Sequence, residues 1–141
     1  MSEIGLHILS GHPLLYVLSN EEERFVGMLQ RFCMRQKTPL KIYRLSEGLR
    51  EVSFSGDALW QVARHGKLKE ELRDPIAMLE QLKKSTPAEG IFLLLDFHPM
   101  LRDALAKRLL KDVGQRFKQC RNTAIILAPV LNLPVDLASD R

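Results

Sequence analysis

The chain has 141 residues and a mass of 16.2 kDa, which is near the commonest size of a single domain. Hydrophobic residues make up 45% of it and charged residues 27%, a balance that supports a packed core and excludes disordered and low-complexity proteins. The formal net charge of +4 is uneven, because residues 1–60 are balanced and the whole excess falls in residues 61–141.

The N-terminal segment predicts a short helix followed by a strand. Residues 4–9 have the composition of one or two helical turns that end at Gly11. After Pro13, the run from Leu14 to Leu18 is continuously apolar, the pattern of a strand buried on both faces.

A longer helix is expected next. Ser19 or Asn20 is a good N-terminal cap, and Glu21 to Glu23 place negative charge in the first turn, where the helix dipole favours it. The helix should run to about Lys37. Its predicted buried face consists of Phe25, Leu29, Phe32 and Cys33.

The middle of the chain has the weakest pattern. Residues 40–45 suggest a second strand that ends at Ser46-Glu47-Gly48. Beyond it, Glu51 to Phe54 suggests extended backbone, and Asp57 to Arg64 has the spacing of a short helix.

A helix start is clear at Asp74-Pro75, with the aspartate as cap and the proline at the first helical position. This helix is expected to continue to about Ser85. Its inward side chains are predicted to be Ile76, Leu79 and Leu82.

The last elements are a strand, a helix and a strand. Ile91 to Asp96 is the strongest strand pattern, and Phe97 to Pro99 should turn the backbone. A long helix from about Leu101 to Cys120 follows, and then a strand over Thr123 to Ala128. The predicted buried ladder of this helix is Leu105, Leu109, Val113 and Phe117.

This alternation of strands and helices implies βαβ units and a mostly parallel sheet. The expected fold class is therefore α/β, a three-layer sandwich formed by residues 1–141 as one domain.

No uninterrupted apolar run approaches the roughly 20 residues that span a bilayer, and no secretory leader pattern opens the sequence. We therefore expect a soluble cytoplasmic protein without membrane contact. The two cysteines, Cys33 and Cys120, are too few and too far apart for a disulfide framework or a metal site, so both are expected to be reduced thiols.

Nucleotide-binding motifs are missing. A P-loop needs G-x-x-x-x-G-K-[ST] after its first strand, so that bare backbone amides can cradle phosphate. In that position this chain has Ser19 and Asn20 followed by the three carboxylates of Glu21 to Glu23. There is also no G-x-G-x-x-G, G-x-S-x-G or H-E-x-x-H pattern, so no catalytic residue, cofactor or metal is assigned.

Ligands of open α/β sheets bind beyond the carboxyl ends of the strands. The polar residues expected there are Asp96 and His98 after one strand, and Ser46 and Glu47 after another. Asp96 and His98 could serve an enzyme with an atypical nucleotide or small-molecule site. Alternatively, Asp96 caps a turn and His98 holds the loop by hydrogen bonds.

The predicted helix 101–121 is strongly basic, since residues 102–121 contain seven Lys/Arg against two Asp/Glu. The candidate partner-binding side chains on it are Lys107, Arg108, Lys111 and Lys118. They could form an ordinary solvated face, a docking surface for a protein, or a surface for nucleic acid, although few aromatic residues are available to stack on bases.

Six stretches, spread over nearly the full length, together resemble a known family in both sequence and order. They are Pro13 to Val17, Glu21 to Arg24, Ser46 to Arg50, Asp74-Pro75, Gly90 to Pro99 and Ile125 to Leu131. Among them, the run from Asp96 to Pro99 is the most distinctive. With these stretches in this order, the chain resembles the N-terminal region of a family of AAA-type ATPases found in cyanobacteria, plastid genomes and other bacteria.

The resemblance implies a degenerate RecA-like domain that lacks Walker A and precedes a true AAA module. It also implies that the strand at 123–128 lies between the first strand and the strand at 91–96. The family's ATP-binding and hydrolytic residues have no counterparts here, because the chain ends at Arg141, about where that module would begin.

The leading hypothesis is therefore a non-hydrolytic regulatory or protein-interaction domain that docks a partner protein or its own ATPase module. The alternatives are an enzyme that uses Asp96 and His98, and nucleic-acid binding through the basic helix.

Overall fold

The computed structural model describes residues 3–54, 60–62 and 73–129. The helices in these ranges are α1 (Glu3–Leu9), α2 (Glu22–Gln36), α3 (Pro75–Leu82), the 3₁₀ helix η2 (His98–Arg102) and α4 (Ala104–Cys120). The strands are β1 (Leu14–Leu18), β2 (Leu40–Arg44), β3 (Gly48–Phe54), β4 (Trp60–Val62), β5 (Ile91–Leu94) and β6 (Thr123–Ala128).

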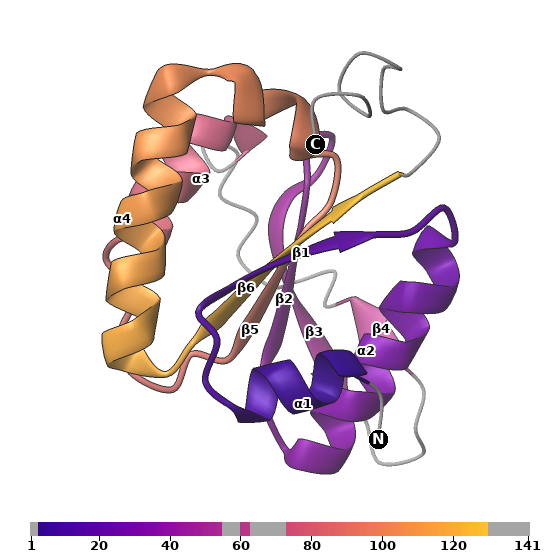
Figure 1. The fold of residues 1–141 in the computed structure, drawn as a ribbon. Coiled ribbons are helices and arrows are strands. Elements are labelled where there is room, and N and C mark those ends of the chain that lie inside the picture. The colour runs from indigo at the N-terminus through magenta and orange to yellow at the C-terminus, as the bar shows by residue number, and fades with distance from the viewer. Residues whose placement is uncertain (1–2, 55–59, 63–72, 130–141) are drawn as a thin grey trace.

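The described strands form one six-stranded sheet in the order β1-β6-β5-β2-β3-β4 (Figure 1). The first four strands of this order are parallel, and β3 and β4 extend the sheet in antiparallel fashion. The α/β class and the mostly parallel sheet are thus confirmed. So is the position of β6 between β1 and β5 that the family resemblance implied.

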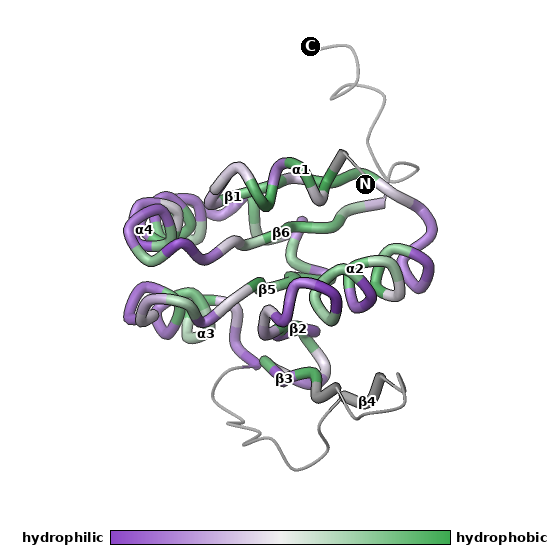
Figure 2. Tube along the Cα trace, turned by 90° about the horizontal axis from the view of Figure 1, so that it is seen from below, coloured by the Kyte–Doolittle hydropathy of each residue, from purple (hydrophilic) through white to green (hydrophobic). Residues whose placement is uncertain are grey.

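Helices cover both faces of the sheet, with α3 and α4 on one side and α1 and α2 on the other (Figure 2). The two faces enclose separate buried clusters. Alternate residues of a strand point to opposite faces, so Ile126 of β6 joins the α3/α4 cluster while Ile125 and Leu127 join the α2 cluster. All six residues of β6 are buried, so the molecule is a three-layer sandwich centred on β5 and β6.

Two helices begin at aspartate caps. The Asp74 carboxylate accepts a hydrogen bond from the Ala77 amide at 3.0 Å, as its position before Pro75 predicts. The Asp103 carboxylate accepts from the Ala106 amide at 2.8 Å. Consequently α4 begins at Ala104 rather than at Leu101, because the preceding residues form η2.

The start of α2 is one or two residues later than predicted. Its N-cap is Glu21, which makes no side-chain capping bond. The Ser19 hydroxyl instead accepts a hydrogen bond from the Glu21 amide at 3.1 Å, within the turn that leads into the helix. The predicted buried face of α2 and its end near Lys37 are confirmed.

Three expectations are wrong for identifiable reasons. β1 is an edge strand, so Tyr16 and Leu18 are 51% and 39% exposed instead of buried. Leu105 is 53% exposed, and Ala106 takes the inward position in the first turn of α4. The residues Trp60–Val62 pair with β3 as a strand, although their spacing favoured a helix. The rest of that predicted helix lies outside the described residues.

The amino ends of the parallel strands are joined by hydrogen bonds. The Ile91 amide donates to the Pro39 carbonyl at 3.0 Å, which connects β5 to the start of β2. On the other side, the Thr123 amide donates to the Gly90 carbonyl at 3.1 Å, and the Thr123 hydroxyl donates to the His12 carbonyl at 3.2 Å.

A buried side-chain amide completes this edge. Asn122 is 1% exposed; its carbonyl oxygen accepts from the Gly90 amide at 3.1 Å, and its nitrogen donates to the Thr86 carbonyl at 3.1 Å. Gly90 has a φ of +104°, and a Cβ there would lie 2.2 Å from the Pro39 carbonyl oxygen. Only glycine therefore fits between β2 and β5.

We expect Gly90→Ala to lower the free energy of unfolding by more than about 3 kcal/mol, because it adds a backbone clash to the cost of an unfavourable φ. Gly11→Ala is the matched control, since Gly11 also has a positive φ, +83°, but nothing lies within 4 Å of its Cβ position. It should cost about 1 kcal/mol. Urea unfolding of both variants gives the comparison, and equal losses would contradict the clash.

Asn122→Ala should lower the free energy of unfolding by about 2 to 3 kcal/mol, because it leaves the Gly90 amide and the Thr86 carbonyl without their side-chain partner. In contrast, the protonated carboxyl of Asn122→Asp can accept from the Gly90 amide and donate to the Thr86 carbonyl, whereas its ionised form is a buried acceptor-only anion. Asn122→Asp should therefore be less destabilising than the isosteric hydrophobic replacement Asn122→Leu at low pH, and this advantage should be lost at high pH. Thermal unfolding of the three variants measures the difference, and an unaltered midpoint for Asn122→Ala would contradict the assigned role.

Candidate functional site

The carboxyl edge of the parallel strands is the expected ligand side of this sheet. Four segments reach it: residues 19–22 after β1, 45–48 after β2, 96–98 after β5 and Pro129 after β6. The predicted residues Ser46, Glu47, Asp96 and His98 all lie on this edge, as the sequence pattern indicated.

The turn after β1 borders a surface hollow of ≈ 470 Å³. Its lining residues are Asn20, Glu21, Glu22, Glu23 and Arg24. Every one of these residues carries a Cβ, and the Glu21 amide already donates to the Ser19 hydroxyl. The hollow therefore has room for a small group, and three carboxylates are among the side chains that line it.

Two of the three carboxylates are paired with arginines. Glu21 contacts Arg24 at 3.3 Å on the surface, and Glu22 contacts Arg44 at 3.0 Å. The second pair joins the first turn of α2 to the carboxyl end of β2. Because both of its side chains are partly exposed, it contributes about 1 kcal/mol or less. The pair leaves the Arg44 guanidinium bound to the Glu22 carboxylate.

Ser46 and Glu47 belong to the short turn between β2 and β3. The Glu47 amide donates to the Arg44 carbonyl at 3.1 Å, and the Glu47 carboxylate lies 3.9 Å from Arg50 Nε. Arg50 Nε is buried and has no hydrogen-bond partner among the described residues. Glu47 is therefore engaged in the hairpin, while Ser46 is exposed.

Asp96 and His98 differ in their surroundings. Asp96 is exposed and has a left-handed backbone, with a φ of +59°. His98 is half-buried, and its Nδ1 is buried without a hydrogen-bond partner in the described part of the chain. No hydrogen bond or ion pair joins the two residues within the described ranges. The observed geometry fits Asp96 as a turn residue.

Tyr43 is the buried group beneath this edge. Its hydroxyl donates to the Arg73 carbonyl at 2.6 Å, which holds the segment before α3 against β2. Burial, followed by the negative charges of Asp74 and Asp96, raises the pKa of Tyr43 from 10.0 to about 12. The hydroxyl therefore stays protonated and serves as a donor throughout the neutral range.

The predicted basic residues lie on the exposed side of α4. Lys107, Arg108, Lys111 and Lys118 are all exposed. Arg108 Nε is 3.6 Å from an Asp112 carboxylate oxygen. Within the described ranges the three lysines have no ion pair, so their charges are available to a partner.

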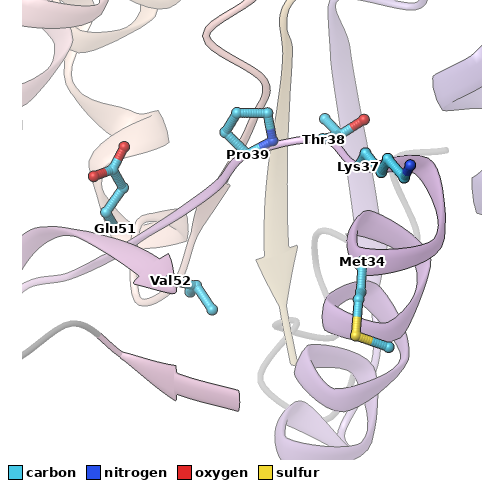
Figure 3. A pocket seen from close by; sticks show the side chains of 6 residues that line it. All are labelled: Met34, Lys37, Thr38, Pro39, Glu51 and Val52. Atoms are coloured by element: carbon cyan, nitrogen blue, oxygen red, sulfur yellow. The ribbon is translucent and has the colours of Figure 1, made fainter. Parts of the chain in front are cut away.

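A second hollow, of ≈ 310 Å³, lies at the opposite edge of the sheet (Figure 3). Its lining residues are Met34, Lys37, Thr38, Pro39, Glu51 and Val52. Sequence reasoning missed it, because it forms where the end of α2 meets β3 and neither element has a distinctive motif. The exposed surface of its lining is mainly apolar, although Lys37, Thr38 and Glu51 are among the lining residues.

The two cysteines are free and buried, and burial raises the pKa of the Cys33 thiol to about 12. In the described ranges, no three His, Cys, Asp or Glu side chains are grouped as metal ligands. None of the helices there has the length and apolar content needed to cross a membrane.

Comparison with known proteins gives two findings. The family model for the N-terminal domain of SpoVK-like AAA ATPases matches residues 1–141. A curated relative, the uncharacterized AAA domain-containing protein ycf46 of Gracilaria tenuistipitata var. liui, is 25% identical over 134 residues. No solved structure matches the chain.

The match to the algal protein covers 94% of this chain but 25% of that protein, so the chain spans about a quarter of its relative's length. The full-length family match and the α/β sheet with the expected strand order agree. This chain belongs to the family of N-terminal domains of SpoVK-like AAA ATPases.

Proposed function

We propose that this domain serves an AAA ATPase in the cytoplasm as a non-hydrolytic regulatory module that binds protein: its own ATPase module or a separate partner. In this proposal the sheet is a degenerate RecA-like scaffold. ATP is bound instead by an AAA module, the kind of domain that the name of the algal relative mentions.

The turn after β1 is the observation that carries the proposal. Phosphate binding at this position requires several free backbone amides that a ligand can approach closely. Here the turn is lined by Glu21, Glu22 and Glu23, and one of its amides is already bonded to Ser19. A triphosphate in the adjacent hollow would meet negative charge on residues whose Cβ atoms also keep it from the backbone.

The other carboxyl-edge residues support the same conclusion. Glu22 is paired with Arg44, and Glu47 with Arg50, so these groups are engaged within the fold. Asp96 and His98 are not joined, which leaves the atypical enzyme without a paired acid and base. A domain with this edge is better suited to contact a protein than to bind and hydrolyse a nucleotide.

Isothermal titration of the chain with Mg-ATP should show no saturable heat at micromolar concentrations, because the turn lacks a phosphate cradle. Saturable micromolar binding would overturn the proposal. A variant with Glu21, Glu22 and Glu23 all replaced by glutamine is the matched control. This variant should also fail to bind Mg-ATP tightly, because glutamine side chains remove the negative charge but still have Cβ atoms, unlike the glycines of a phosphate-binding loop.

Substitutions of Asp96 distinguish two roles for this residue, a structural role in the turn and a role as a ligand-binding acid. Asp96 has a φ of +59°, which glycine adopts readily and alanine does not. Asp96→Gly should therefore leave the free energy of unfolding unchanged or raise it by up to about 1 kcal/mol, whereas Asp96→Ala should lower it by about 1 kcal/mol. Urea unfolding measures both. A markedly less stable Asp96→Gly variant would contradict the assigned turn role. A ligand signal that both variants abolish without unfolding would favour the enzyme instead, and variants that only lower stability would count against it.

A further inference from the structure

The outer edge of β1 is an open edge of the sheet within the described residues. Among the described strands β1 pairs with β6 alone, and Figure 1 shows it crossing in front of that strand. At the two ends of this ladder, the Ala124 amide donates to the Pro13 carbonyl and the Ser19 amide donates to the Ala128 carbonyl, both at 2.9 Å. In a parallel ladder every second residue faces the neighbouring strand. Residues 15 and 17 therefore bond to β6 as well.

The backbone groups of Leu14, Tyr16 and Leu18 consequently point away from the sheet. No hydrogen bond to the described residues satisfies the outward amides of Tyr16 and Leu18. Their side chains are 51% and 39% exposed on the α4 side. β1 carries no charge, proline or bulge, which are the usual devices that block an edge strand. It is therefore able to accept another strand.

The side of α4 that faces this edge is basic. Gly114 marks that side, because a Cβ on it would lie 2.8 Å from the Leu14 side chain of β1. At 100° per residue, Lys107 lies about 20° and Lys111 about 60° from the direction of Gly114 around the helix axis. Lys118 lies about 40° from it. The three lysines therefore form a stripe toward β1.

The lysine stripe and the exposed part of β1 also lie at the same level along the direction of the strand. α4 connects the parallel strands β5 and β6, so it runs opposite to them and to β1. From Gly114 back to Lys107 the helix rises about 10 Å, and from Leu14 to Leu18 the strand rises about 13 Å. Lys107 is thus level with the carboxyl half of β1, where Tyr16 and Leu18 are exposed.

From this juxtaposition we infer that β1 binds an extended acidic segment of a partner protein, which adds a strand to the sheet and places its carboxylates against Lys107 and Lys111. Backbone hydrogen bonds to Tyr16 and Leu18 provide the pairing, and the lysine stripe selects the charge. The inference deepens the proposed function and rests on it, since it names the class of protein segment that the domain recognises.

Two other occupants fit these features less well. A second copy that paired its β1 antiparallel to this one would place α4 on the same face of the continuous sheet, so that the lysine stripes of both copies would approach each other. Nucleic acid would satisfy the lysines but would leave the strand amides unused, and Tyr16 is the single aromatic residue exposed on β1. An acidic peptide in extended form uses both features.

The test uses a short fluorescent peptide of alternating valine and glutamate, with valine/lysine and valine/serine peptides of the same length as controls. Fluorescence anisotropy should show saturable binding of the valine/glutamate peptide and at least about tenfold weaker binding of the valine/lysine peptide. Lys107→Glu should weaken the first peptide about tenfold. Lys84→Glu, the same charge change at an exposed lysine just after α3, should change it less than about twofold.

Amide exchange measured by NMR identifies the edge. The bound peptide should protect the Tyr16 and Leu18 amides, whereas the Leu15 and Val17 amides should be protected with or without it. Peptides methylated on the nitrogens of either all valines or all glutamates give a second control. Because only one set of amides can face β1, one methylated peptide should lose binding and the other should keep it.

Several outcomes would overturn the inference: no saturable binding of the valine/glutamate peptide, equal effects of Lys107→Glu and Lys84→Glu, or protection elsewhere in the chain. Protection of Tyr16 and Leu18 by self-association, or displacement of the peptide by a DNA duplex with a higher affinity for the lysines, would also overturn it. Mg-ATP titration of the same samples distinguishes a failure of this inference from a failure of the proposed function. If neither the peptide nor ATP binds, only the strand-addition model is rejected.

Discussion

The arrangement of the parallel strands depends on the buried amide of Asn122. It holds the Gly90 amide on one side and the Thr86 carbonyl on the other, at the point where β5 and β6 begin. Because parallel strands are not joined by tight hairpins, their register must be set by such contacts at their ends and by the core. Gly90 allows the β2 chain to approach closely, so that β2, β5 and β6 start at one well-defined edge.

The opposite edge is under much weaker constraint. Its turns contain exposed residues such as Ser46 and Asp96, and its ion pairs are partly solvated. Phosphate binding in α/β sheets resides in these turns, not in the buried strands. The residues of these turns can therefore differ without any loss of core packing. Three glutamates after β1 are compatible with a fully formed sandwich around β5 and β6.

The sequence predicted the elements whose pattern reflects burial on both faces or a strong local cap. β6 was predicted with its observed bounds, and the Asp74 cap was predicted from the proline that follows it. An apolar run cannot reveal that β1 lies at an edge, because strand position is set by pairing with distant residues. Leu105 was misassigned because residues four apart drift by about 40° around a helix, so that Ala106 instead faces the core in the first turn of α4. The second hollow and the α4 lysine stripe depend on how separate elements pack together, which the sequence pattern does not show.

The same topology governs how the chain is made. β1 is the first described strand, yet its partner is β6: residue 14 lies beside residue 124. The high sequence separation of this contact is typical of slow folding, because a long loop must close before the contact is gained. During synthesis β6 is the last of the described strands to leave the ribosome. The backbone groups of β1 and β5 that pair with β6 therefore stay unpaired until residues 123–128 arrive between them.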